Sequence, residues 1–212
     1  MAEVNGISMY YATFGAGDPV LLIHGGMVNS DHWSAQVTDL MKDHLVIVAD
    51  SRGHGRSSHD ERPVSYDLMA EDYIALLDFL KIPKVDIVGS SDGGIIGLDI
   101  AMHHPERLDD LFAQGANVTP DGVISSGPPP EDFILWTTAD YARKSPTPDG
   151  FEDLIGEMSA LYEREPNWSD EALATITAPV TLALGDHDAD VSRAHTDHMA
   201  AVIPGAKEVI LP

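Results

Sequence analysis

The chain contains no cysteine, few basic residues and no long apolar run. The lack of cysteine excludes disulfides, thiolate metal sites and cysteine nucleophiles. Lys and Arg number 12 against 35 Asp and Glu, which gives a formal net charge of −23. Such a surface repels nucleic acids and anionic membranes, so we expect neither as a partner. No stretch approaches the ~20 apolar residues that a membrane-spanning helix needs.

The N-terminal residues Met1–Asn5 carry neither the basic nor the apolar segment that begins a signal peptide. We therefore expect a cytoplasmic protein. The 212 residues suffice for one domain with a large core, and a hydrophobic content of 43% is that of a globular protein.

The central feature of the sequence is the run Gly89–Gly94, which reads GSSDGG. It follows a β-branched apolar run at residues 84–88 and precedes a segment with helical spacing at 95–102. A strand, a sharp turn with G-x-S-x-G and a helix are typical of a nucleophile elbow. Ser91 would lie at its tip with an exposed hydroxyl, and the helix N-terminus would favour negative charge there. The alternative interpretation is a simple Gly-Ser loop.

A second candidate loop follows the apolar run at residues 19–23, which predicts a strand buried on both faces. The loop His24–Met27 reads HGGM, and its backbone N–H groups would supply half of an oxyanion hole. A plain strand-to-helix turn is the alternative. We assign His24 a structural role, because a base would need to lie on the other side of Ser91. Asp31 is the expected cap of the helix that follows.

Two more expected strands end in polar loops. Residues 45–49 lead into a glycine-spaced loop, in which we expect Asp50 and Arg52 to fix the backbone and His54 to stabilise the loop. Residues 178–184 lead into a loop with three aspartates that compete for the role of a catalytic acid. These are Asp186, Asp188 and Asp190.

Strands that alternate with helices predict an α/β fold, with a mostly parallel central sheet flanked by helices. Further strands are expected at residues 108–114 and 207–211. Between about 118 and 176, breakers such as Gly127–Pro130 separate short helices. We interpret this segment as a helical cap insertion within a single domain, residues 1–212. Ligands of such sheets bind beyond the carboxyl ends of the strands.

Together these motifs resemble the α/β-hydrolase family, especially its small serine carboxylesterases, over nearly the whole chain. The matching pieces are HGG at 24–26, D-x-R-G-x-G-x-S at 50–57, G-x-S-x-G-G at 89–94 and G-x-x-D at 185–188. The resemblance implies hydrolysis of small carboxylic esters, short-chain ones in particular, through an acyl-serine intermediate at Ser91, without metal or other cofactor. It implies Asp188 as the acid of the triad. The oxyanion hole would consist of the N–H groups of Asp92 and of Gly26 or Met27.

The chain departs from the family pattern at its C-terminal end. In the family the triad histidine and a helix follow the last strand, whereas this sequence stops at Pro212, so we expect a C-terminally truncated form. A serine hydroxyl is a weak nucleophile without a base. Three hypotheses therefore stay open: an esterase with another base, a degenerate binding protein, and an acyltransferase or perhydrolase. A metal site at His195 and His198 with nearby aspartates is a weaker alternative.

The last expected strand would have little cover without that helix. We therefore expect Val209, Ile210 and Leu211 to be less buried than their composition suggests. A homo-oligomer, or a rearrangement of local segments, is expected to cover this edge.

Overall fold

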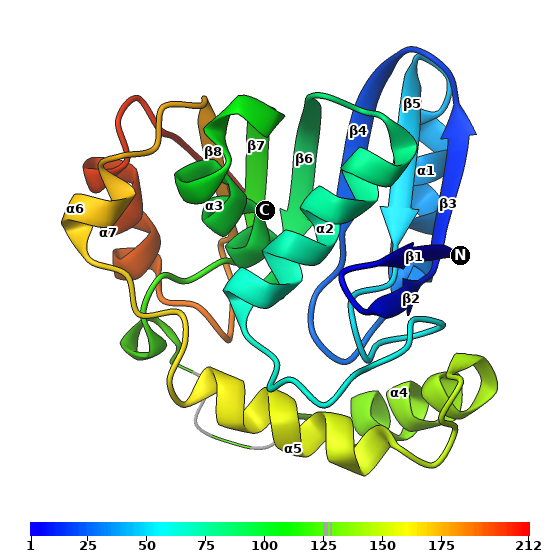
Figure 1. Ribbon diagram of the computed structural model, residues 1–212. Helices are drawn as coiled ribbons and strands as arrows, with labels where there is room; N and C mark the ends of the chain where they lie inside the picture. Colours follow the sequence, from blue (N-terminus) through cyan, green and yellow to red (C-terminus); the bar gives the residue numbers. More distant parts are fainter. Residues whose placement is uncertain (125–126, 128) are drawn as a thin grey trace.

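The computed structural model describes residues 1–124, 127 and 129–212 and contains a seven-stranded sheet in the order β3-β5-β4-β6-β7-β8-β9 (Figure 1). β3 (Tyr11–Gly15) pairs antiparallel with β5 (His44–Ala49), and every other pair of neighbours in this sheet is parallel. The expected mostly parallel α/β sheet is confirmed. The other strands are β4 (Asp18–Ile23), β6 (Val85–Ser90), β7 (Leu108–Gln114), β8 (Val180–Gly185) and β9 (Lys207–Leu211).

A small hairpin precedes the main sheet. β1 (Ala2–Val4) and β2 (Ile7–Met9) pair antiparallel around a turn at Asn5 and Gly6, which have φ of 42° and 82°. Two left-handed residues suit the right-handed twist of the flanking strands, and Asn and Gly tolerate that conformation best. The hairpin therefore occupies the first nine residues of the chain.

Helices cover both faces of the sheet, because alternate residues of its central strands point to opposite sides. Leu21 and Ile23 share one core with residues of α2, α3 and α7. Val20 and Leu22 belong to a second cluster, against which side chains of α1 pack. β4 is thus buried on both faces, as its continuous apolar run predicts. The helices named here are α1 (Ser34–Leu40), α2 (Tyr66–Leu80), α3 (Asp92–His103) and α7 (Arg193–Val202).

Two helix starts illustrate how local and distant contacts compete. Ser65 caps α2 locally, since its side chain accepts a hydrogen bond from the N–H of Leu68. The expected cap at Asp31 is wrong: Asn29 caps the short helix η1 (Ser30–Trp33), and its side chain accepts from the N–H of Asp31. The Asp31 carboxylate instead forms ion pairs with Arg56 and Lys144.

The segment between β7 and β8 carries the helices of the expected cap. Figure 1 shows α4 and α5 lying across the carboxyl ends of the strands, with α6 beside α7. Pro128, part of an expected breaker, lies outside the described residues. The remaining helices are η2 (Pro105–Arg107), η3 (Pro120–Gly122), α4 (Glu131–Lys144), α5 (Phe151–Tyr162) and α6 (Asp170–Leu173).

The two edge strands of the main sheet, β3 and β9, are less buried than the strands between them. β9 pairs with β8, and Val209 and Leu211 are each 38% exposed, as expected from the sequence. Within the described part of the chain, no helix combines the length and the apolar character that a membrane crossing requires.

Candidate active site

Ser91 lies at the carboxyl end of β6, where the chain turns sharply into α3. Its φ of 54° and ψ of −121° form a strained conformation for a residue with a side chain. Such strain costs about 1–3 kcal/mol and persists only where surrounding contacts enforce it. Here the Ser91 N–H donates to the carbonyl of Gln114 at 2.8 Å, and the side chain stays exposed. The turn therefore has the backbone expected of a nucleophile elbow.

The elbow depends on a glycine at the close approach of two chain segments. A Cβ atom on Gly93 would overlap the carbonyl oxygen of Ile23 at the end of β4. The loop after β4 then passes directly beside the serine, because a Cβ on Gly25 would lie 3.1 Å from the Ser91 Cβ. Close packing of turn and loop brings two sequence motifs together at one edge of the sheet.

Three backbone N–H groups near Ser91 are candidate oxyanion donors. Within residues 1–124, 127 and 129–212, the N–H groups of Gly26, Met27 and Asp92 donate no hydrogen bond to a backbone carbonyl. Met27 has φ of 62°, so the loop bends sharply there. Unpaired donors beside a nucleophile are what stabilisation of an oxyanion requires. These three groups remain the candidate donors.

His24 supports this loop from the interior. Its Nδ1 lies 2.7 Å from the carbonyl oxygen of Gly25, and its Nε2 accepts the N–H of Ser51 at 2.9 Å. Burial lowers the pKa of His24, and both ring nitrogens contact backbone groups. The structural role expected for His24 is confirmed. His54 is also buried, with its Nδ1 2.9 Å from the Arg52 carbonyl oxygen, and burial lowers its pKa to about 3.

Asp188 is the aspartate of its loop that is turned toward the neighbouring strand end. Its Oδ1 accepts the N–H groups of Asp190 at 3.0 Å and Val191 at 2.9 Å. Its Oδ2 would lie 3.8 Å from a Cβ on Gly115, the residue after β7. Asp186 is exposed and pairs loosely with the exposed His187 at 3.8 Å. This geometry favours Asp188 over Asp186 as an acid facing the site.

The described hydrogen bonds and ion pairs engage several histidines away from Ser91. His195 accepts the N–H of Val118 through its Nε2, and His198 contacts Asp170. These two side chains therefore bind different segments and do not converge with the aspartates after β8 on one metal site. The other pairs are His59 with Glu157, His103 with Asp99, and His104 with Glu71.

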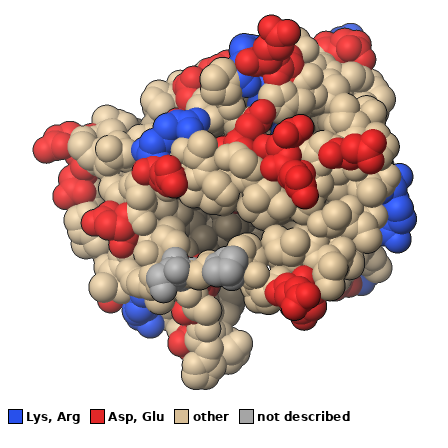
Figure 2. Space-filling view, turned by 90° about the horizontal axis from the view of Figure 1, so that it is seen from below, with Lys and Arg blue, Asp and Glu red and all other residues tan. Residues whose placement is uncertain are grey.

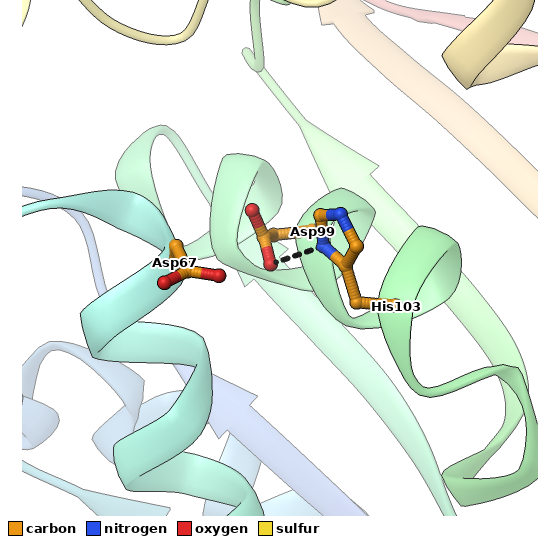
Figure 3. Close-up of side chains that lie close together, drawn as sticks. All are labelled: Asp67, Asp99 and His103. Atoms are coloured by element: carbon orange, nitrogen blue, oxygen red, sulfur yellow. Dashed lines mark hydrogen bonds and ion pairs between the residues drawn. The ribbon is translucent and has the colours of Figure 1, made fainter.

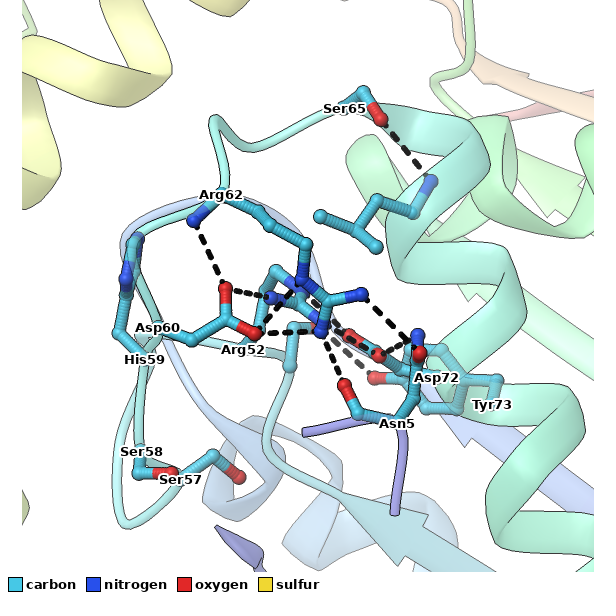
Figure 4. A network of polar contacts seen from close by, with 12 residues as sticks. Asn5, Arg52, Ser57, Ser58, His59, Asp60, Arg62, Ser65, Asp72 and Tyr73 are labelled. Atoms are coloured by element: carbon cyan, nitrogen blue, oxygen red, sulfur yellow. Dashed lines mark hydrogen bonds and ion pairs between the residues drawn. The ribbon is translucent and has the colours of Figure 1, made fainter. Parts of the chain in front are cut away.

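A buried salt bridge anchors the loop after β5. Arg52 is fully buried and donates two hydrogen bonds of 2.7 Å to Asp72 of α2, and a third of 3.1 Å to Asp60 (Figure 4). Asp50 accepts from the N–H groups of Ser30 at 2.9 Å and Arg56 at 2.8 Å. The two residues thus fix their loop, as expected, but they do so by binding other segments too.

One group of potential metal ligands lies on α2 and α3. Single ligand atoms of Asp67, Asp99 and His103 all lie within 4.8 Å of one another (Figure 3). The Nδ1 of His103 is 3.0 Å from Asp99 Oδ1, and this bond raises the pKa of His103. This hydrogen bond favours the protonated imidazole and accounts for the close approach of His103 to the buried Asp99 carboxylate.

The side chain of Asp92 is a feature that sequence analysis missed. It is buried, and its two oxygens accept hydrogen bonds from the hydroxyls of Tyr66 at 3.0 Å and Tyr162 at 2.8 Å. Burial raises its pKa to about 6, although both tyrosine hydrogen bonds act in the opposite direction. The sequence feature that could have indicated this buried carboxylate is an acidic residue inside a glycine-rich turn, where the chain must pack tightly.

The face that covers the carboxyl end of the sheet is hollowed and predominantly acidic. Figure 2 shows this face, with a depression at its centre and more Asp and Glu than Lys and Arg around it. An acidic rim repels anionic ligands and favours neutral or cationic ones.

Comparison with known proteins assigns the family. Residues 18–176 match the model of the alpha/beta hydrolase fold. The chain belongs to this family. The RutD protein of Azorhizobium caulinodans, which carries the name of a carbamate hydrolase, is 35% identical over a 226-residue alignment that covers 94% of this chain and 84% of that protein. The 3-oxoadipate enol-lactonase 2 of Acinetobacter baylyi is 38% identical over 108 residues, 50% of this chain and 40% of that protein.

Solved structures agree with this assignment. A hydrolase from Pseudomonas aeruginosa superimposes with a TM-score of 0.77 and 26% identity, covering 98% of this chain and 87% of that one. The fold expected from the sequence is therefore confirmed at the level of the family. Because these relatives are hydrolases, the protein is a hydrolase of the α/β-hydrolase superfamily.

Proposed function

We propose that this α/β-hydrolase cleaves carboxylic esters of small molecules through an acyl intermediate on Ser91. The observation that carries the proposal is the strained turn, which holds an exposed Ser91 hydroxyl at φ 54° beside the glycine loop after β4. Strain of this kind at an exposed polar residue is typical of functional sites. The nearby N–H groups of Gly26, Met27 and Asp92, which donate to no described backbone carbonyl, would supply the second requirement of acyl transfer.

In the proposed reaction, Ser91 Oγ bonds to the ester carbonyl carbon while its proton passes to a base. The carbonyl oxygen gains negative charge, which the N–H groups of Asp92 and of Gly26 or Met27 would stabilise. A single donor of this kind is worth about 2.7–4 kcal/mol. The C–O bond to the alcohol then breaks and the alcohol takes up a proton. Water repeats the attack and releases the carboxylic acid, and Asp188 would orient the protonated base.

The names of relatives support this reaction class. A lactone is a cyclic ester, so the enol-lactonase of Acinetobacter baylyi carries the name of an enzyme that opens an ester. A carbamate, the substrate class in the name of the RutD relative, has a related carbonyl centre. We extend the shared chemistry, attack on an acyl carbon, to this chain.

A fluorophosphonate probe tests the nucleophile. We expect one label per chain, lost in Ser91→Ala and kept in Ser90→Ala. Ser90 is a matched control because it is the adjacent serine, with its hydroxyl donating to Gln114 Oε1 at 2.8 Å. Turnover of p-nitrophenyl acetate should follow the same pattern. Labelling or turnover that survives in Ser91→Ala would overturn the proposal.

The alternatives differ in the step after acylation. Because the described hydrogen bonds join no histidine to Ser91, a binding protein with little turnover is the second candidate. Stoichiometric labelling with no release of product above background would support it. An acyltransferase or perhydrolase would instead transfer the acyl group to an added alcohol or to peroxide in preference to water, which product analysis by mass spectrometry distinguishes.

A further inference from the structure

The buried Asp92 carboxylate is the meeting point of three segments. Asp92 belongs to α3, directly after the candidate nucleophile, and is 5% exposed. Tyr66, at the start of α2, donates to its Oδ1, and Tyr162, the last residue of α5, donates to its Oδ2. Tyr162 is itself 37% exposed, so a residue at the surface of the cap reaches a carboxylate in the interior. The cap is thereby attached to the nucleophile turn.

Other contacts hold the same end of α5 in place. Arg164 donates to the carbonyl of Val64 at 2.7 Å, and Glu165 accepts the backbone N–H of Tyr66 at 3.1 Å. The chain after α5 is therefore bound to the start of α2, close to which it lies in Figure 1. The position of the Tyr162 hydroxyl is determined by two neighbouring attachments as well as by its own hydrogen bond.

The same hydroxyl also packs against the loop after β4. A Cβ atom on Gly26 would overlap Tyr162 Oη and would lie 2.5 Å from Asp92 Oδ2. The hydroxyl and the carboxylate therefore lie directly against the backbone of Gly26. Gly26 is next to Met27, and one of their N–H groups is a candidate oxyanion donor.

We propose that Tyr162 is a positioning residue, whose hydroxyl holds the loop His24–Met27 in place by binding Asp92 and packing against Gly26. The inference rests on the proposed function for its catalytic consequence, because only an acyl transfer needs the loop as an oxyanion hole. The cap then has a defined task beyond covering the site. It sets the distance between the two halves of the oxyanion hole, one on the loop and one at the start of α3.

Tyr162→Phe removes the hydroxyl and keeps the ring, so it isolates this contact. The groups that face Asp92 are Tyr66 from α2 and Tyr162 from α5, with Glu165 behind the backbone of Tyr66. Since the Tyr162 hydrogen bond lowers the pKa of Asp92, the variant should titrate Asp92 above the native value of about 6. We expect the ester kcat to fall about tenfold, in line with a lost hydrogen bond to a charged group, with KM little changed.

Tyr141→Phe is the matched control. Tyr141 lies on α4 of the same cap, and its hydroxyl contacts Thr147 Oγ1 at 3.2 Å instead of Asp92. Amide hydrogen exchange at residues 25–27 and the 13C titration of the Asp92 carboxyl should change in Tyr162→Phe and stay native in Tyr141→Phe. Neither measurement needs turnover, so both separate failure of this inference from failure of the proposed esterase activity.

Two results would overturn the inference. If exchange at residues 25–27 and the Asp92 titration are the same in Tyr162→Phe and Tyr141→Phe, the hydroxyl does not hold the loop. If exchange changes in Tyr162→Phe while an active enzyme keeps its native kcat, the loop does not need that position for catalysis. Faster exchange together with a lower kcat in Tyr162→Phe alone supports the positioning role.

Discussion

Replacing Asp92 by asparagine should make the stability of the protein less dependent on pH. The native carboxyl titrates at about 6 instead of 3.8, because burial disfavours its charge. Between these two values the folded protein binds more protons than the unfolded chain does. Stability is therefore lost as the pH rises through this window, and the loss is complete above the folded pKa. Asparagine has no charge to bury, while its amide can still hydrogen-bond to both tyrosines.

The size of the effect follows from the pKa difference. A difference of one between the folded and unfolded pKa corresponds to about 1.36 kcal/mol. The raised pKa of Asp92 therefore lowers the free energy of unfolding by about 3 kcal/mol above pH 7. Part of this decrease is already present at pH 5. Between pH 5 and pH 7.5 the free energy of unfolding falls by a further amount of about 1.4 kcal/mol. That is a measurable share of a typical folding stability of ~5–15 kcal/mol.

Urea unfolding of both proteins at pH 5, 6, 7 and 7.5 measures this difference. All other titrating groups are common to the two proteins, so their contributions cancel when the free energies of unfolding are subtracted. We expect the free energy of unfolding of Asp92→Asn, minus that of the wild type, to be about 1.4 kcal/mol larger at pH 7.5 than at pH 5. A difference that stays constant over this range would show that Asp92 does not titrate there, and would refute the assignment of a raised pKa.

Three further changes test other parts of the structure. Gly93→Ala should lower the melting temperature and abolish fluorophosphonate labelling, because its Cβ would overlap a backbone carbonyl, whereas Gly156→Ala, with open space around it, should do neither. Arg52→Met should lower the free energy of unfolding by about 3–5 kcal/mol, since it leaves the buried Asp72 carboxylate without its charged partner; a loss below about 1 kcal/mol would contradict this. Asp188→Asn should reduce ester turnover at least about tenfold at unchanged melting temperature, and unchanged kinetics would remove Asp188 from the site.

Local sequence signals determined most of the framework. The β-branched runs predict the parallel strands because a strand covered on both faces must be apolar throughout. Ser65 predicts the start of α2 because a side-chain cap acts within a few residues. The elbow was equally predictable, since a Cβ atom on Gly89 would overlap the backbone of Gly93 within the same turn. In each case the physical cause lies within one short segment.

The tertiary structure decided the polar pairings. Asp92 meets tyrosines that are 26 and 70 residues away, and no periodicity in the sequence indicates either partner. Asp31 is a plausible cap by composition, but a lysine 113 residues further on binds its carboxylate, and Asn29 caps the helix instead. Such contacts depend on how helices and loops are packed on the sheet, and packing is a property of the whole chain.

The candidate site combines both kinds of information. Its three loops share one edge because parallel strands end at the same side of a sheet, which the sequence pattern alone indicates. The orientation of Asp188 within its loop, and the contact of a cap tyrosine with Gly26, follow only from the folded chain. Sequence motifs bring chemical groups to an edge, whereas the direction of each group depends on hydrogen bonds and close contacts that form when distant segments pack together.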